Sequence, residues 1–288
     1  MADQSLAIPH LVIGGVRVAP LSRSEICTRV VRDCAKRRSR ADLQRPARLL
    51  FSVNGHALSL AARNPDLRDA LDRADLVHAD GQAIVFASAC LRGPGIPERS
   101  ATTDLIHDLS RVCSTEGLSF FLLGGTEDLN ARCAEALVRL YPGLSIAGRR
   151  NGYFPQELEQ AVCEEINASG ADILWVGLGK PLEQLFSVRN RDKLRVAWAI
   201  TCGGTFGFVA GDYRRAPHWM QSAGLEWLFR AVTGPRRLMW RYLTTNPHAL
   251  FLLATRTHAS PGRTGGRALA PWYRGPTQGD IDSGDGRR

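Results

Sequence analysis

Six short runs of apolar residues alternate along the chain with longer segments in which apolar side chains recur every three to four positions. The short runs have the length of buried strands, and the longer segments have the period of helices that pack one face on a core. This alternation predicts a parallel sheet covered by helices on both faces, a Rossmann-like α/β fold. The expected strands are Leu49–Val53, Leu76–Ala79, Ser119–Leu123, Leu144–Ala147, Ile173–Gly177 and Val196–Thr201.

The expected helices separate these strands, and a β-hairpin turned by Gly14-Gly15 precedes them at Leu11–Val18. The helical segments are Ser22–Arg38, Pro65–Arg73, Gln82–Leu91, Thr103–Glu116, Glu127–Leu140, Gln156–Ala168 and Leu182–Lys193. Ligands of open parallel sheets bind beyond the carboxyl ends of the strands, so we expect the site in loops that directly follow strands. Five such loops are polar or rich in glycine: Asn54-Gly55-His56, Asp80-Gly81-Gln82, Gly124-Gly125-Thr126-Glu127, Gly177–Pro181 and Cys202–Thr205.

The character of the chain changes at Gly211, and we divide it into a core (residues 1–210), an appendage (residues 211–256) and a tail (residues 257–288). The appendage has helical periodicity, several aromatic residues and seven arginines, but only Asp212 and Glu226 as acidic residues. It predicts a basic helical unit that either binds diphosphate through bidentate guanidinium contacts or lies on acidic lipid headgroups. The tail has seven glycines and three prolines without periodicity, and we expect it to be disordered.

Composition narrows the class of protein. With 288 residues, 44% hydrophobic and 23% charged, the chain is not a disordered polymer, a collagen-like repeat or a disulfide-stapled miniprotein. The net charge of +9 favours anionic partners such as phosphate groups or an anionic membrane surface. Nucleic acid is not expected as a partner, because the sequence has no recognisable nucleic-acid-binding module.

Cysteines and apolar runs indicate the compartment. The seven cysteines are an odd number and are never spaced Cys-x-x-Cys, which disfavours a disulfide framework or a zinc site and favours small core residues in a reducing compartment. The first residues lack the pattern of a signal peptide. The longest purely apolar run near the C-terminus, Ala249–Ala254, has six residues, whereas a membrane span needs about 18–20. We therefore expect a cytoplasmic protein that can attach to a membrane surface but does not cross it.

Asp80 is the first candidate catalytic residue, because it ends a strand and precedes a glycine that permits a sharp turn. Its carboxylate either accepts a proton from a hydroxyl nucleophile or caps the helix expected at Gln82–Leu91. Asn54 either hydrogen-bonds a sugar or base edge or is a turn residue before glycine. Gly124-Gly125 and Gly203-Gly204 either present N–H groups to phosphate or form tight strand-to-helix turns, since the chain has neither of the common glycine-rich phosphate motifs.

Several short segments, taken in order, resemble the WecG/TagA/CpsF family of bacterial glycosyltransferases over residues 11–256, most strongly in the appendage. In the core they are Ser52-Val53-Asn54, Asp75–Gly81, Glu98-Arg99, Thr103–Leu105, Phe121–Gly125, Tyr141–Leu144, Asn151–Phe154, Val176–Pro181 and Gly203–Phe206. In the appendage they are Arg215–Met220, Gly224–Arg230, Pro235–Arg237 and Arg241-Tyr242. The chain departs from the family pattern at Ser52 (usually threonine), Thr102 (glycine), Glu183-Gln184 (Gln-Glu) and Gly207 (commonly aspartate).

The resemblance implies an inverting, metal-independent transfer of a hexose or N-acetylhexosamine from a UDP-sugar to a polyprenyl-diphosphate-linked sugar, without a cofactor, in bacterial cell-surface polysaccharide or exopolysaccharide synthesis. It implies that Asp80 is the general base and Asn54 an active-site residue. It also implies that the appendage closes over the site, supplies arginines to the diphosphate and helps the protein to sit on the inner face of the cell membrane. The expected substrate-binding residues are Ser52, Asn54, Gly81, Gly125, Gly179, Glu183, Gly204, Arg215, Arg230, Arg237 and Arg241, with Arg236 close behind.

The departures at Glu183 and Gly207 fall in loops expected to line the site, so the donor sugar stays undetermined. They motivate an alternative function, a non-catalytic, membrane-associated nucleotide-sugar-binding protein that regulates polysaccharide assembly. The sequence leaves association into a homo-oligomer open.

Overall fold

A computed structural model describes residues 10–39, 45–234 and 236–259, apart from the side chain of Arg237. Its centre is a six-stranded sheet in the order β4-β3-β8-β7-β5-β6, and all neighbouring strands are parallel. The six predicted strands are all present, which confirms the Rossmann-like α/β fold. Their bounds are β3 (Arg48–Val53), β4 (Leu76–Ala79), β5 (Ser119–Gly124), β6 (Ser145–Arg150), β7 (Ile173–Gly177) and β8 (Trp198–Thr201).

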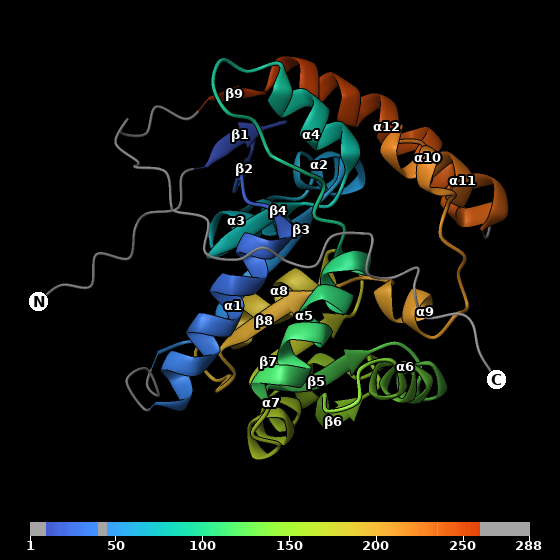
Figure 1. Cartoon of the computed structure of the whole chain (residues 1–288). Helices are drawn as coiled ribbons and strands as arrows, with labels where there is room; N and C mark the ends of the chain where they lie inside the picture. Colours follow the sequence, from blue (N-terminus) through green and yellow to red (C-terminus); the bar gives the residue numbers. More distant parts are fainter. Residues whose placement is uncertain (1–9, 40–44, 235, 260–288) are drawn as a thin grey trace, which may run out of the picture.

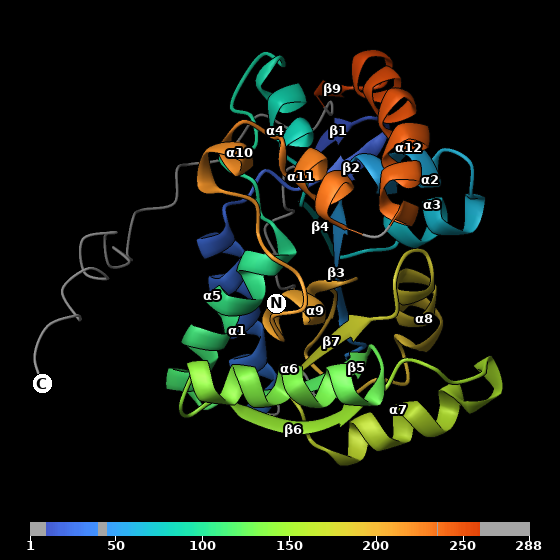
Figure 2. The same cartoon turned by 90° about the vertical axis from the view of Figure 1, so that its right-hand side faces the viewer.

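Helices cover both faces of the sheet, as Figure 2 shows for α1 and α5 on one side and α7 and α8 on the other. The strands are apolar on both faces: Leu50 packs in the core cluster of the first side, and its neighbours Leu49 and Phe51 pack in that of the second. The first side holds α1 (Arg23–Arg38), α5 (Thr102–Glu116) and α6 (Glu127–Leu140). The second holds α2 (Gly55–Ala61), α3 (Pro65–Asp72), α7 (Glu159–Ala168) and α8 (Leu182–Asn190), and α4 (Gln82–Ala89) and α9 (Thr205–Val209) follow β4 and β8.

Polar caps set several helix starts close to their predicted positions. Ser22 forms a capping box with Glu25 at α1, Asn64 caps α3 just before Pro65, and Thr126 caps α6. The segment expected to be helical from residue 156 starts instead as a 3-10 turn, η1 (Gln156–Leu158). Helix α2 was not among the predicted helices, and its first residues, Gly55 and His56, were expected to be part of a loop, because seven residues are too few to show a helical period.

The appendage consists of α10 (His218–Ser222), α11 (Glu226–Thr233) and α12 (Arg236–Thr255), and Figure 1 shows them on one side of the molecule. Helix α12 packs on α2 so closely that a Cβ on Gly55 would lie 3.3 Å from the Cβ of Ala249. Among the described residues, no helix is long and apolar enough to cross a membrane.

The chain after the appendage returns to the N-terminal hairpin. Strand β9 (His258–Ala259) pairs with β1 (Leu11–Ile13), which pairs with β2 (Val16–Val18), so these three strands form a second sheet. The prediction of disorder from residue 257 is therefore wrong for residues 257–259, and its remaining part, residues 260–288, lies outside the described residues.

Gly124 ends β5 directly opposite Gly177 of β7, with φ of +141°. A Cβ atom there would lie 2.3 Å from the carbonyl oxygen of Gly177. Both the backbone conformation and the close approach of the two strands therefore require glycine.

We expect Gly124→Ala to lower the free energy of unfolding by about 2–6 kcal/mol, because it adds backbone strain to a steric clash. Gly170→Ala is the matched control, because Gly170 has φ of +67° and open space around it, and it should cost about 1–2 kcal/mol. Urea unfolding measures both. Equal losses for the two variants would contradict the close approach at Gly124.

Candidate active site

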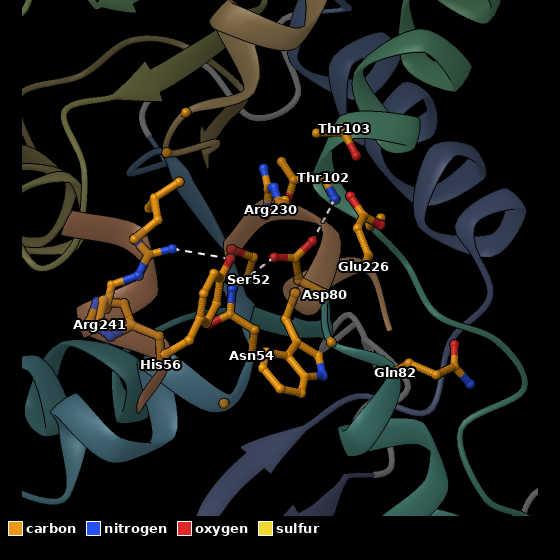
Figure 3. A pocket seen from close by; sticks show the side chains of 18 of the residues that line it. Ser52, Asn54, His56, Asp80, Gln82, Thr102, Thr103, Glu226, Arg230 and Arg241 are labelled. Atoms are coloured by element: carbon orange, nitrogen blue, oxygen red, sulfur yellow. Dashed lines mark hydrogen bonds between the residues drawn. The ribbon is translucent and has the colours of Figure 1, made fainter. Parts of the chain in front are cut away.

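A cavity of about 1200 Å³ lies at the carboxyl ends of β3, β4, β7 and β8, and α11 and α12 complete its wall (Figure 3). Four of the five predicted loops meet there, and the loop after β5 does not. Eight of the predicted site residues line the cavity: Ser52, Asn54, Asp80, Gly81, Gly179, Gly204, Arg230 and Arg241.

Asp80 and Asn54 are adjacent because they follow the last paired residues of two neighbouring parallel strands, Ala79 and Val53. The Asn54 side-chain amide donates to Asp80 Oδ2 at 3.0 Å, while its Oδ1 accepts from the N–H of Ala57 at the start of α2. Asn54 therefore serves both as a helix cap and as the residue that orients Asp80.

The carboxylate of Asp80 does not cap the helix that follows it. The N-cap of α4 is Gly81, and no side-chain hydrogen bond caps that helix. Asp80 Oδ1 instead accepts from the N–H of Thr102, the first residue of α5, at 2.9 Å. The capping interpretation of Asp80 is thus wrong for α4, and the carboxylate joins β4 to the start of α5.

Asp80 is ionised at neutral pH. Burial raises the pKa of its carboxyl, but Lys180, His78, the N–H of Thr102 and the amide of Asn54 lower it, and the net pKa lies below the ordinary 3.8. An ionised carboxylate that faces a cavity is able to accept a proton.

Glu183, expected to bind substrate, does not line the cavity. Its side chain is fully buried, and its Oε2 accepts from the N–H groups of Gly179 at 3.1 Å and Gly203 at 2.8 Å. The carboxylate therefore holds together the loops after β7 and β8. It also uses the N–H of Gly203, which the sequence suggested for phosphate. In the loop after β7, Gly179 and Lys180 line the cavity.

Gly125, an expected site residue, and Gly207, a departure from the family pattern, also lie away from the expected contacts. Gly125 lies outside the cavity lining, and its carbonyl accepts from the N–H of Gly152. Gly207, where the family commonly has aspartate, lies against Tyr213, and a Cβ there would be 2.5 Å from the ring. The tyrosine ring thus fills the space that a side chain at position 207 would need.

Two appendage arginines face the cavity. The guanidinium of Arg230 lies over the ring of Phe208 at 4.4 Å, and that of Arg241 lies over Tyr242 at 5.0 Å and donates to its hydroxyl. Neither forms an ion pair with a carboxylate of the described residues, so both remain available to an anionic ligand. The side chain of Arg237 lies outside the described part of the chain.

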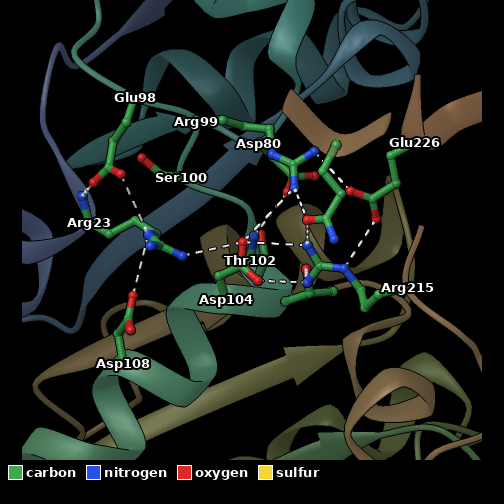
Figure 4. Close-up of polar contacts among 12 residues, drawn as sticks. Arg23, Asp80, Glu98, Arg99, Ser100, Thr102, Asp104, Asp108, Arg215 and Glu226 are labelled. Carbon is green, nitrogen blue, oxygen red and sulfur yellow. Dashed lines mark hydrogen bonds and ion pairs between the residues drawn. The ribbon is translucent and has the colours of Figure 1, made fainter. Parts of the chain in front are cut away.

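Arg215 has a different position from these two and does not line the cavity. Its guanidinium donates to Asp104 at 2.6 Å and to Gln221 at 2.6 Å, and lies 3.4 Å from Glu226 (Figure 4). Glu226 in turn accepts from Arg99 at 2.8 Å. Arg215 therefore docks the appendage on the start of α5, and its expected role in substrate binding is not supported by its position.

Lys180 and His56 also line the cavity, although neither is among the expected substrate-binding residues. Burial, Arg241 and Lys180 lower the pKa of His56 to about 4, so its imidazole is neutral at pH 7. Both residues stand in loops that directly follow strands, which is the signal that could have identified them. His78 is fully buried and donates from Nδ1 to the carbonyl of Ser100, which makes it a core residue next to the site.

The site thus combines an ionised carboxylate with unpaired guanidinium groups across one cavity. Within the described ranges, no group of three or more His, Cys, Asp or Glu side chains is placed to hold a metal ion. Such an arrangement is able to take a proton from a nucleophile and to stabilise negative charge that develops on a phosphate leaving group.

A family model described as "Glycosyl transferase WecG/TagA/CpsF family" matches residues 11–262, which include both the sheet and the appendage. The chain therefore belongs to the WecG/TagA/CpsF family of glycosyltransferases.

Proposed function

We propose that the protein is an inverting, metal-independent glycosyltransferase of bacterial cell-surface polysaccharide or exopolysaccharide synthesis. It moves a hexose or N-acetylhexosamine from a UDP-sugar to a polyprenyl-diphosphate-linked saccharide. The observation that carries the proposal is the ionised Asp80 carboxylate in the same cavity as the unpaired guanidinium groups of Arg230 and Arg241.

In the proposed reaction, an acceptor hydroxyl transfers its proton to Asp80 while its oxygen attacks the anomeric carbon of the donor. The bond from that carbon to the diphosphate oxygen breaks, and UDP leaves with the electron pair. Inversion requires the attacking oxygen and the leaving group on opposite faces of the sugar. In the view of Figure 3, Ser52 lies between Asp80 and Arg241, whereas Arg230 lies near Asp80.

We expect Asp80→Asn to lower kcat about 10²–10⁴-fold, the usual contribution of a general base, without loss of the fold. The assay incubates the protein with a panel of UDP-sugars and a lipid-diphosphate acceptor and identifies products by mass spectrometry. Asp69→Asn, a carboxylate that is 68% exposed, is the control and should act as wild type. A parental rate for Asp80→Asn would refute the base assignment.

The same assay separates the proposal from its alternative. A wild-type protein that binds UDP saturably but forms no product from any donor would be the non-catalytic nucleotide-sugar-binding regulator. The alternative was motivated by Glu183 and Gly207, but Glu183 is buried beneath the loops and Gly207 is covered by Tyr213. The structural position of these departures thus favours the enzyme.

The pH profile tests the contact between Asn54 and Asp80. Asn54→Ser keeps a capping hydroxyl for α2 but removes the amide that donates to the charged carboxylate. Because that donor favours the charged form, its loss raises the pKa of Asp80, and the activity is lost at a higher pH as the solution is acidified. We expect the acid limb of kcat/KM to move up by about one pH unit. Lys180 and Arg215 keep their charges in this variant, so an unchanged profile would exclude Asp80 as the titrating base.

We further propose that the appendage attaches the protein to the inner face of the cell membrane. Several large apolar side chains of α10, α11 and α12 are exposed, among them Trp219, Val232 and Trp240. Their combination with arginines is typical of surfaces that lie in a membrane interface. Attachment would bring the cavity close to an acceptor whose polyprenyl chain stays in the bilayer.

Val232 and Trp240 are 75% and 70% exposed, and the double variant Val232→Ser/Trp240→Ser should bind anionic vesicles at least about tenfold more weakly. Cosedimentation with phosphatidylglycerol vesicles measures this. Tyr153→Ser is the control, since Tyr153 is 78% exposed but lies outside the appendage. Equal binding by the double variant and the control would argue against attachment through α11 and α12.

A further inference from the structure

Lys180 has an unusual position for a lysine, because only 11% of its side chain is exposed. Its Nζ donates to Ser52 Oγ at 3.0 Å and lies 3.5 Å from Glu183 Oε1, and the residue lines the cavity. An ammonium group has three N–H donors, and these two contacts use two of them. One donor is left for a group bound in the cavity.

His56 shows that Lys180 and Arg241 belong to the same region of the cavity. These are the two cations that, after burial, lower the pKa of the His56 imidazole. His56 Nδ1 and Arg241 Nε are both buried without a hydrogen-bond partner among the described residues. Buried donors and acceptors without partners cost free energy, so a small movement of these side chains that lets a bound ligand supply the missing contacts would be favourable.

The charges in this region specify the ligand. The cation of Lys180 comes from the core and that of Arg241 from the appendage, and like charges in one region repel unless an anion lies between them. Of these two cations, Lys180 lies beside the carboxylate of Glu183 and also lowers the pKa of Asp80, whereas no carboxylate of the described residues pairs with Arg241. A neutral imidazole adds a hydrogen-bonding group without adding positive charge. These groups fit a diphosphate better than a single hydroxyl or a neutral sugar ring.

We propose that Lys180 and His56, together with Arg241, form the subsite for the diphosphate of the nucleotide sugar. This inference rests on the proposed glycosyl transfer. Lys180 also donates to the hydroxyl of Ser52, and Ser52 lies between Arg241 and Asp80 in the view of Figure 3. The subsite thus places the leaving group beside Ser52. It needs both the core and the appendage, so the bound diphosphate also joins these two parts.

The experiment must distinguish diphosphate binding by Lys180 from a purely structural role, in which Lys180 only neutralises the buried Glu183. Lys180→Met alone leaves the Glu183 carboxylate buried without its cation, which can destabilise the fold. The double variant Lys180→Met/Glu183→Gln removes both charges together. Lys193→Met removes an exposed lysine outside the cavity and is the control. Thermal unfolding shows which variants are folded.

Isothermal titration with UDP and with uridine is the decisive measurement, because only UDP carries the diphosphate. We expect Lys180→Met and the double variant to bind UDP about 10- to 100-fold more weakly than wild type, as for the loss of a charge-assisted hydrogen bond. Their affinity for uridine should be unchanged, and Lys193→Met should bind both ligands as wild type. His56→Leu should weaken the binding of UDP about two- to tenfold, the effect of losing a neutral hydrogen bond.

Wild-type affinity for UDP in the folded double variant would overturn the proposal, because Lys180 would then only neutralise Glu183. Equal wild-type affinities for UDP and uridine would overturn it as well, because no diphosphate subsite would exist. Sugar transfer is measured on the same preparations. Its absence in the wild type refutes the proposed function, whereas transfer with a UDP affinity insensitive to Lys180 refutes the subsite alone.

Discussion

The negative charge of Asp80, largely withdrawn from water, is the constraint on which the cavity depends. A buried carboxylate costs several kcal/mol unless hydrogen-bond donors and positive charge surround it. Three separate parts of the chain meet this requirement: Asn54 after β3, the first N–H of α5 at Thr102, and Lys180 after β7. The base is therefore ionised and oriented only where the sheet, α5 and the loop after β7 come together.

Glu183 is a second buried carboxylate that is stabilised by hydrogen-bond donors and a positive charge, but it does not line the cavity. Its buried carboxylate accepts N–H groups from Gly179 and Gly203 and lies beside the ammonium of Lys180. The N–H of Gly203, which the sequence suggested for phosphate, thus donates to a carboxylate of the protein itself. The fixed loops in turn present Lys180 to the cavity, so a residue without contact to the cavity shapes its wall.

The appendage contributes positive charge to this site and is joined to the core at three places. Arg215 binds Asp104 at the start of α5 while Glu226 binds Arg99 just before it, α12 packs on α2, and β9, directly after the appendage, pairs with β1. Two of these contacts lie at helices that also position the reaction centre. Helix α5 begins at Thr102, whose N–H donates to Asp80, and Asn54 is the N-cap of α2. Docking of the appendage and orientation of the base are therefore mechanically connected.

The sequence by itself determined the sheet, most helices and the pair of Asp80 and Asn54. Periodicity is a local property, and parallel strands bring their carboxyl ends to one edge, so residues that follow strands could be predicted to meet.

Only the tertiary structure decided which charged side chains face the cavity. Arg215 meets Asp104 across 111 positions and Lys180 meets Ser52 across 128. A long side chain is able to reach a ligand, a carboxylate or solvent from the same backbone position. The choice depends on neighbours that no local pattern contains, which is why Lys180 was missed and Glu183 and Arg215 were expected to bind substrate.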